Sequence, residues 1–228
     1  MSTLAPPGRS QLRDAAAAQI RELIIAGLAR PGELLRLAPL AAHIDASVTP
    51  VREALLLLAQ DGWVVQEPNR GFRVAAMKRK DVEDAYLVHA FVAGELARRA
   101  AAAATPESVE ILRRLDEEIN SLDGTDEVHS EHLNYELHDA IYAIADSARL
   151  ALFVTAASRF VPRRYWTTIP GWRELNRSEH KPIIDAVEAG NAARAGKLMS
   201  AHIAAAGQLL LAHLDAVGFW SNASSDQA

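Results

Sequence analysis

The sequence predicts a mainly α-helical protein in two parts: a small N-terminal part with three helices and a β-hairpin, then an all-helical antiparallel bundle. Helical apolar spacing runs through most of the 228 residues, and only 12 Gly and 10 Pro interrupt it. Residues 1–80 contain 11 Lys and Arg against 7 Asp and Glu, whereas the remainder is acidic. The whole-chain net charge of −5 therefore conceals a basic N-terminal part and does not argue against a nucleic-acid partner.

Composition excludes several classes of protein. Hydrophobic residues make up 50% and charged residues 23% of the chain, proportions that allow a packed core. The absence of cysteine excludes disulfides, thiolate zinc sites, iron–sulfur clusters and a cysteine nucleophile. No run approaches about 18 uncharged apolar residues, and the first residues lack the apolar stretch of a signal peptide. We therefore expect a soluble cytoplasmic protein without a membrane partner.

Three helices are expected in the N-terminal part. Apolar spacing predicts the first over about 10–28, with Ser10 as its candidate N-cap. A short second helix covers about 39–44, and the third opens at Thr49, a hydroxyl cap that is followed by proline. The inward stripe of the third helix consists of Val51, Leu55 and Leu58. Arg52 is left on its outward side, and the two short helices have the organisation of a helix-turn-helix.

A β-hairpin is expected after the third helix. Residues 63–65 and 72–74 are short β-type runs, and the segment between them contains Arg70 and Gly71. Such a hairpin forms a wing with a basic tip beside the helices. Glycine lets a backbone approach a phosphate or a groove closely, so Arg70 and Gly71 are candidate DNA contacts.

Four stretches of the N-terminal part resemble the winged-helix DNA-binding domain of the GntR superfamily of bacterial repressors. They are residues 30–35, 40–41, 47–55 and 69–72, and the segment T-P-V-R-E-A-L is the most specific of them. The resemblance covers about 10–76 and implies a winged helix-turn-helix. It also implies DNA contacts from the recognition helix and the wing tip, made by Ser47, Thr49, Arg52 and Gly71.

The sequence departs from this family at two positions. Val48 stands where the family usually has arginine, and Asp45 where it usually has glycine. The arginine would add a bidentate contact to guanine worth about 1–3 kcal/mol of base discrimination. We therefore expect a different operator sequence or a lower affinity. Two alternatives stay open: a protein-interaction module, and a surface ion pair between Arg52 and Glu53 or Asp61.

The second part is helical by periodicity, with Asp81 as the candidate N-cap of its first helix. The expected helices cover about 81–104, 107–121, 127–145, 148–160, 174–189 and 192–214. The predicted division of the chain is a DNA-binding domain at 1–77, a linker at 78–81, a helical domain at 82–217 and a flexible tail at 218–228.

Polar residues of the second part form a candidate metal site. Asn134 and His138 lie four residues apart and share one helix face, while His180 and His202 lie on two later helices. An antiparallel bundle can bring three such faces together, and imidazole with carbonyl oxygen suits a divalent transition metal. The alternatives are histidines that are hydrogen-bonded in the core, and a metal-free polar pocket built from the same residues.

The same residues resemble the FCD ligand-binding domain of the FadR-like branch of GntR regulators. Asn134-x-x-x-His138 is similar to its D-x-x-x-H motif, and residues 179–195 and 199–203 are similar to its C-terminal signature. The resemblance covers about 81–214. It implies a divalent transition metal such as zinc or nickel, whose coordination a small carboxylate effector completes. The implied ligands are Asn134, His138, His180 and His202.

Departures from the FCD pattern affect the effector. Asn134 replaces the commoner aspartate, so a bound divalent ion keeps its full charge and favours an anionic effector. Phe91 stands at a commonly basic position. Arg159, Arg163 and Arg164 are weaker candidates for binding the effector carboxylate, and the alternative is that they are solvated.

The sequence thus predicts a non-enzymatic transcriptional regulator, a repressor in its expected form. A homodimer binds a palindromic double-stranded DNA operator, and a small carboxylate controls the affinity. One alternative is a metal-dependent hydrolase, because three histidines with open coordination positions can polarise a water molecule. The other is a dedicated metal sensor.

Overall fold

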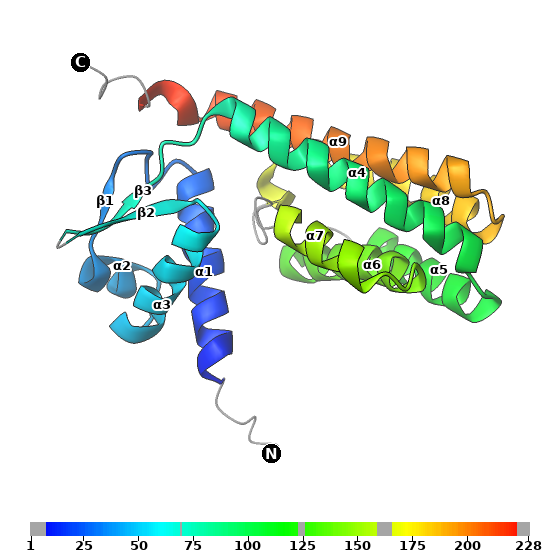
Figure 1. Ribbon diagram of the computed structural model, residues 1–228, viewed down its shortest axis with the longest axis horizontal. Coiled ribbons are helices and arrows are strands. Elements are labelled where there is room, and N and C mark those ends of the chain that lie inside the picture. Colours follow the sequence, from blue (N-terminus) through cyan, green and yellow to red (C-terminus); the bar gives the residue numbers. More distant parts are fainter. Residues whose placement is uncertain (1–7, 69, 123–125, 159–165, 223–228) are drawn as a thin grey trace. The chain divides into compact units, whose positions relative to one another are not determined.

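The computed structural model of the chain describes residues 8–68, 70–122, 126–158 and 166–222 (Figure 1). The described residues form two compact units: residues 8–79 with 214–222, and residues 80–158 with 166–213. The predicted linker, 78–81, lies where the chain passes between the units, but it is helical from Arg79. None of the helices in these ranges combines the length and apolar character that a membrane span needs.

Three helices form the body of the first unit: α1 (Arg9–Ile25), α2 (Leu37–His43) and α3 (Val48–Gln60). α3 packs against both α1 and α2. The inward stripe predicted for α3 is confirmed, because Val51, Leu55 and Leu58 are fully buried. Their spacing of three and four residues places them on one helix face and leaves Arg52 on the other.

Helices α1, α3 and α4 (Arg79–Ala103) begin earlier than their predicted caps. Ser10 lies inside α1, whose N-cap residue is Gly8, and Asp81 lies in the first turn of α4. In α3 the extended residue before the helix is Ser47 (φ −81°, ψ 158°), not Thr49. The three predicted caps, Ser10, Thr49 and Asp81, are therefore wrong. A proline in the first turn marks a helix start only loosely, because every N–H of that turn lacks an intrahelical partner.

The predicted hairpin is confirmed. β2 (Val64–Glu67) and β3 (Gly71–Val74) are antiparallel, with Glu67 opposite Gly71. A third strand, β1 (Leu34–Leu35), pairs with the other edge of β3 and gives the order β1-β3-β2. The sequence did not indicate β1, because two residues are too few to show strand alternation. The unit also contains the short 3₁₀ helix η2 (Phe219–Asn222), where the predicted tail begins.

The second unit consists of helices whose ends lie close to the predicted ones, apart from the outermost residues of α4 and α9, which group with the first unit. After α4 these helices are α5 (Pro106–Ser121), α6 (Glu127–Ile144), α7 (Ala148–Ser158), α8 (Trp172–Glu188) and α9 (Ala192–Ala216). A short 3₁₀ helix, η1 (Trp166–Thr168), precedes α8. α5 packs against both α6 and α8.

α4 and α9 lie side by side and run antiparallel (Figure 1). Gly94 of α4 and Gly196 of α9 allow this approach, because a Cβ atom at Gly94 would lie 2.9 Å from the carbonyl oxygen of Gly196. Further along, the ring of Tyr86 fills the space that a Cβ atom at Gly207 would need, 2.6 Å from that position. These two pairs set the register between the helices.

Candidate metal centre and DNA-binding surface

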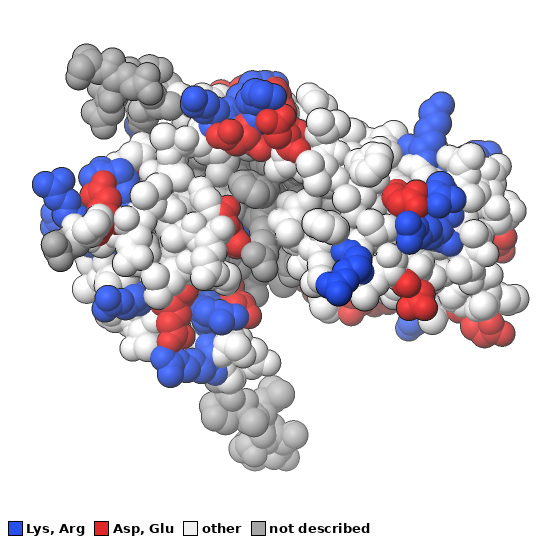
Figure 2. All heavy atoms as spheres, in the orientation of Figure 1, with Lys and Arg blue, Asp and Glu red and all other residues white. Residues whose placement is uncertain are grey.

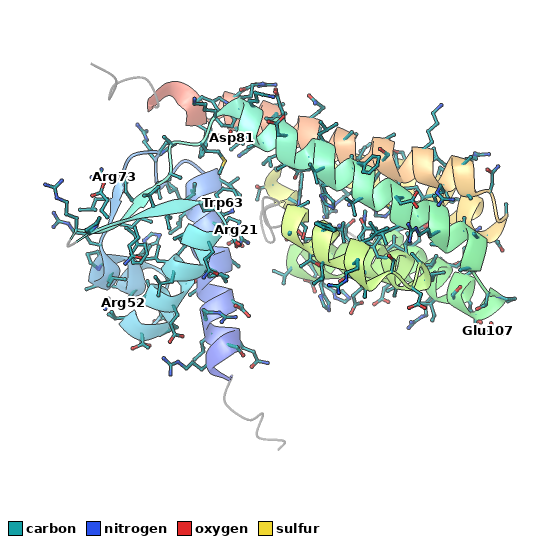
Figure 3. The ribbon with its side chains drawn as sticks, viewed as in Figure 1. Arg21, Arg52, Trp63, Arg73, Asp81 and Glu107 are labelled. Carbon is teal, nitrogen blue, oxygen red and sulfur yellow. The ribbon has the colours of Figure 1, made fainter. Side chains whose placement is uncertain are left out.

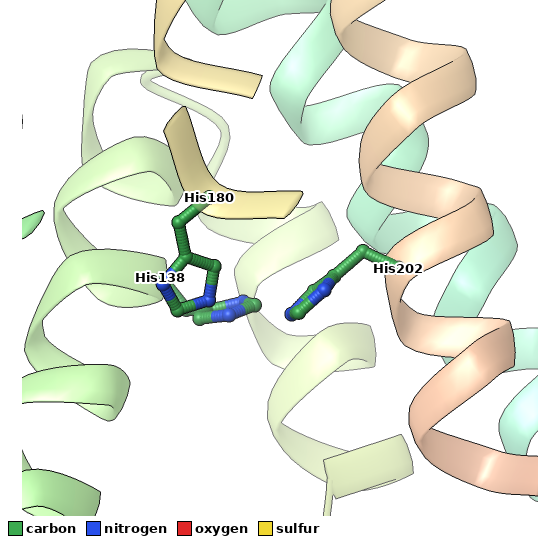
Figure 4. A group of neighbouring side chains, drawn as sticks. All are labelled: His138, His180 and His202. Carbon is green, nitrogen blue, oxygen red and sulfur yellow. The ribbon is translucent and has the colours of Figure 1, made fainter. Parts of the chain in front are cut away.

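Three histidine side chains from different helices converge in the interior of the second unit (Figure 4). His138 comes from α6, His180 from α8 and His202 from α9, and their exposed fractions are 8%, 2% and 3%. One ring nitrogen of each lies within 4.8 Å of the other two. The ring centroids are 4.9 to 5.5 Å apart. The structure therefore brings together the three histidines that the sequence singles out.

Hydrogen bonds orient two of the rings but not the third. Nδ1 of His138 lies 3.3 Å from Oη of Tyr142, and Nδ1 of His202 lies 3.0 Å from Oε2 of Glu179. Both ring nitrogens of His180 are buried, and neither has a hydrogen-bond partner among the described residues. An unpaired buried nitrogen costs about 1–3 kcal/mol, which favours a ligand at His180. Three converging imidazoles fit a divalent transition metal.

Burial also sets the protonation state of these rings. Desolvation, and to a smaller extent the neighbouring imidazoles, lower the pKa of His138 and His180 well below the ordinary value of 6.5. Both rings are therefore neutral at pH 7. Neutral imidazole is the form that coordinates a metal, so the site does not have to release a proton from these two rings to bind one.

Asn134 lies one helical turn before His138 on α6 and is 8% exposed. Its Oδ1 atom is buried and has no partner among the residues that the structure describes. An unpaired amide oxygen on the face of His138 is compatible with the fourth ligand that the sequence predicts. The metal role of Asn134 stays a prediction.

Two residues of this site were not singled out from the sequence. Tyr142 lies one turn after His138, so helical spacing could have indicated it. Glu179 comes from α8 and meets His202 of α9, a contact that depends on how the two helices pack. A carboxylate bonded to a metal-binding histidine fixes its tautomer and raises its basicity.

The surface predicted to bind DNA lies at the start of α3. Arg52 is exposed and points away from the core of its unit (Figure 3). Ser47 and Thr49 are exposed on the same turn. Val48 lies between them with 45% of its surface exposed, so the position where the family usually has arginine faces solvent.

The two carboxylates that the sequence offered as partners for Arg52 are engaged elsewhere. Glu53 accepts a hydrogen bond from Nε of Arg9 at 2.9 Å. Asp61 lies 3.9 Å from the guanidinium of Arg21, in the interior of the unit. Arg52 is therefore held by neither of them.

The turn before α3 and the tip of the wing both use left-handed backbone. Gly71 has a φ of +100°, which glycine adopts without steric cost. Asp45, which replaces the family's usual glycine, has a φ of +49°. Aspartate is one of the few other residues that tolerate this region, which explains how the turn is kept. Arg70 is exposed beside Gly71, whereas Asn69 lies outside the described residues.

Figure 2 shows that the Lys and Arg side chains of the first unit lie in separate groups on the face in view, with Asp and Glu among them. The positive charge of the N-terminal part is therefore not gathered into one continuous patch on this face. Individual exposed side chains such as Arg52 and Arg70 are therefore better candidates for DNA contacts than a general basic surface. The predicted effector-binding residues Arg159, Arg163 and Arg164 lie outside the described residues.

A winged helix with an exposed recognition helix, followed by an all-helical domain, defines a class of DNA-binding transcriptional regulators. Two family models match the chain: "Bacterial regulatory proteins, gntR family" over residues 12–74 and "FCD domain" over residues 84–205. The chain belongs to the GntR family of bacterial regulatory proteins and carries an FCD domain.

Individual relatives agree with this assignment. The HTH-type transcriptional repressor GlaR of Escherichia coli is 29% identical over 191 residues, which cover 79% of this chain and 87% of that protein. The uncharacterized HTH-type transcriptional regulator YdhC of Bacillus subtilis is 24% identical, with 81% and 84% covered. The solved structure of E. coli McbR/YncC is 18% identical and matches with a TM-score of 0.59, over 92% of this chain and 99% of that chain. This last likeness shows the fold alone.

Proposed function

We propose that the protein is a homodimeric repressor whose affinity for a palindromic DNA operator is set by a small carboxylate bound beside a divalent metal. The observation that carries the proposal is the convergence of three buried imidazoles in a domain that follows an exposed recognition helix. The name of the relative GlaR, a repressor, supports the direction of regulation.

On the DNA side, the start of α3 enters the major groove. Its hydroxyl and guanidinium groups reach base edges and phosphates, while the wing contacts the sugar–phosphate backbone. The contacting residues are Ser47, Thr49, Arg52, Arg70 and Gly71. Val48 offers an apolar contact of the kind that suits a thymine methyl group, in place of an arginine contact to guanine. The operator therefore differs from those of relatives that have arginine at this position.

In the helical domain, Asn134, His138, His180 and His202 hold a divalent transition metal such as zinc or nickel. When bound, the metal supplies a positive charge that anchors an anionic oxygen of the effector. All four side chains would bind in a neutral form, so none of them offsets the positive charge of the metal ion. A carboxylate effector would supply the balancing negative charge.

A second copy of the chain covers an apolar face of the helical domain. Large apolar side chains are exposed on α4 and α7, with exposed fractions between 51% and 75%: Leu87, Val88, Phe91, Leu152 and Phe153. Nη1 of Arg99 in α4 lies 3.4 Å from Oγ of Ser147, the residue before α7, and Figure 1 draws α4 and α7 on the near side of this unit. A two-fold dimer buries such a patch and supplies the two recognition helices that palindromic half-sites need.

Regulation follows from a difference in effector affinity between two states of the dimer. The carboxylate binds more tightly to one arrangement of the recognition helices than to the other, and this shifts the population between them. A coupling free energy of about 2 kcal/mol is enough for a change of tens-fold in operator affinity.

The test is fluorescence anisotropy with labelled duplexes from the region upstream of the protein's own gene, with the protein metal-loaded or stripped by chelator. We expect salt-sensitive binding to one duplex over a scrambled duplex of equal length, and a tens-fold change when a carboxylate is added to the loaded form only. Equal binding to the scrambled duplex would contradict the DNA-binding role. A response to metal alone, with no further effect of any carboxylate, would identify a metal sensor instead. Lower expression of a reporter gene in the presence of the protein checks repression.

A further inference from the structure

Two buried polar side chains of α4 take no part in the proposed metal site: His89, beside the histidine cluster, and Tyr86, one helical turn before His89. His89 is 8% exposed and Tyr86 is 5% exposed. Nδ1 of His89 and Oη of Tyr86 are both buried, and neither has a hydrogen-bond partner among the residues that the structure describes. The two rings are neighbours on the same face of the helix, with centroids 6.2 Å apart.

The packing of α4 on α9 places His89 next to the cluster. Gly94 faces Gly196, and Tyr86 faces Gly207, so the antiparallel register puts His89 at the level of His202. An electrostatic effect of His202 on His89 agrees with this placement. His89 is nevertheless not one of the three histidines whose nitrogens lie within 4.8 Å of one another, so it stands beside the proposed ligands.

The ring of Tyr86 packs against α9 at Gly207, where the facing helix has no side chain. A Cβ atom at Gly207 would lie 2.6 Å from two atoms of the Tyr86 ring, so only glycine at this point of α9 accommodates the ring. The phenol is thereby packed into the interior with its hydroxyl group unpaired. Leaving the hydroxyl of Tyr86 and Nδ1 of His89 unpaired costs about 1–3 kcal/mol each, which a partner with matching hydrogen-bonding groups would recover.

The chemistry of these two groups selects the kind of partner. Desolvation and the neighbouring His202 lower the pKa of His89 to about 4, so its ring is neutral at pH 7 and offers one donor and one acceptor nitrogen. The phenol of Tyr86 donates one hydrogen bond and accepts another. A carboxylate only accepts and is stabilised best by cations, whereas an alcohol both donates and accepts. The pair therefore complements a hydroxyl group.

We propose that His89 and Tyr86 form a subsite for a hydroxyl group of the effector, so that the effector is a hydroxycarboxylic acid. This inference rests on the proposed function, in which the carboxylate group of the same molecule lies at the metal. The hydroxyl group donates to the unprotonated nitrogen of His89 and accepts from Tyr86. A site built to pair with a hydroxyl discriminates strongly against the analogue that lacks it, because its buried groups are then left unpaired.

The experiment is isothermal titration calorimetry of the full-length, zinc-loaded protein with matched pairs of acids. The pairs are lactate and propionate, malate and succinate, and 3-hydroxybutyrate and butyrate, with both enantiomers of each hydroxy acid. We expect the protein to bind the hydroxylated member of at least one pair about tenfold more tightly or better. Zinc content, measured by mass spectrometry of the metal, is read out in parallel for every variant.

Tyr86→Phe is the sharper variant, because it removes one oxygen atom and keeps the packed ring. It is expected to lower the affinity for the hydroxy acid about tenfold while leaving the affinity for the matched deoxy acid and the zinc content unchanged. His89→Leu is expected to have the same selective effect. His132→Gln, a change at an exposed histidine of α6 that pairs with Glu136 on the surface, is the matched control and should alter neither quantity.

Three outcomes would overturn the inference. If hydroxylated and deoxy acids bind equally well, the subsite is absent while the proposed carboxylate and metal site stands. If His89→Leu removes zinc, His89 supports the metal directly instead of the effector. If none of the acids binds to the zinc-loaded protein, the proposed carboxylate response itself fails, and the subsite fails with it.

Discussion

Oε2 of Glu179 lies 3.0 Å from Nδ1 of His202, so a carboxylate of α8 orients an imidazole of α9. With Nδ1 engaged in this way, the other ring nitrogen of His202 is the one left to bind the proposed metal. Glu179→Gln keeps a side chain of the same size but removes its charge. We expect it to weaken zinc binding about 10- to 100-fold, measured by competition with a chelating dye.

Glu174→Gln is the matched control for this measurement, because Glu174 lies exposed on the same helix. It should leave zinc affinity unchanged. Equal zinc affinities of the Glu179→Gln variant and the unchanged protein would show that the contact with His202 has no part in metal binding.

The variant His180→Leu separates two contributions to the free energy of unfolding: the cost of unpaired nitrogens in the metal-free protein and the stabilisation that metal binding adds. Leucine is close to histidine in size and removes two buried nitrogens that have no partner among the described residues. Without metal, the variant should be at least as stable as the unchanged protein, with a gain of up to about 1–3 kcal/mol in urea unfolding. Zinc at about 100 times its Kd should stabilise the unchanged protein by about 2.7 kcal/mol and the variant hardly at all. A metal-free variant that is strongly destabilised would assign His180 a packing role.

The stability of the metal-free protein should fall as the pH is lowered below about 6.5, where histidines of the unfolded chain become protonated. Burial lowers the pKa of His138 and His180, and that of His89 to about 4, so the folded chain does not take up these protons over the same range. The unfolded state then binds more protons, and the free energy of unfolding decreases by up to about 1.4 kcal/mol per pH unit for each group.

Urea unfolding in chelator at pH 7.5, 6 and 5 measures this dependence. His180→Leu removes one of the groups and should make the dependence on pH shallower. A free energy of unfolding that is the same at all three pH values would show that the buried rings titrate in the folded protein as they do in the unfolded chain.

Helices could be predicted from this sequence because their signal is local and repeated. Every apolar position of α3 lies within one or two turns of the next, so Val51, Leu55 and Leu58 identify the buried face by themselves. Helix starts could be predicted less well. Thr49 and Pro50 both fit within the first turn of α3, where no N–H has an intrahelical partner, so they do not mark its first residue. A strand as short as β1 has no periodicity to detect.

The site could be predicted only where a resemblance supplied the long-range pairing. Spacing joins Asn134 to His138 on one helix, but nothing local joins either of them to His202. The contact of Glu179 with His202 depends on the packing of α8 against α9. His89 shows no motif at all in the sequence. Its position becomes informative only through the register that Gly94 and Gly196 set between α4 and α9.

Arg52→Ala should weaken binding to the operator about 5- to 150-fold, which corresponds to the loss of about 1–3 kcal/mol expected for one guanidinium contact to a base. Arg52 is exposed at the start of α3, so the change should leave folding intact. The measurement is fluorescence anisotropy at fixed salt with the selected duplex and its scrambled counterpart.

Arg114→Ala, at an exposed arginine of α5, is the control: it removes the same charge from the other unit and should change binding little. Equal losses on both duplexes would assign Arg52 to a phosphate contact without base selectivity.

Phe91→Glu should convert the proposed dimer to a monomer. Phe91 is 75% exposed on α4 and belongs to the apolar face that also includes Leu87 and Leu152. In a two-fold dimer each copy would contribute its own glutamate, so the variant would bury two unpaired charges in the interface. Sedimentation velocity at micromolar concentration measures the change, and operator binding should weaken with it because a single recognition helix reads only one half-site. Val128→Glu introduces the same charge at a residue of α6 that is 68% exposed outside this face, and should leave the dimer intact. A dimer that survives Phe91→Glu would move the interface to another surface, whereas loss of the dimer in both variants would indicate that added negative charge alone is responsible.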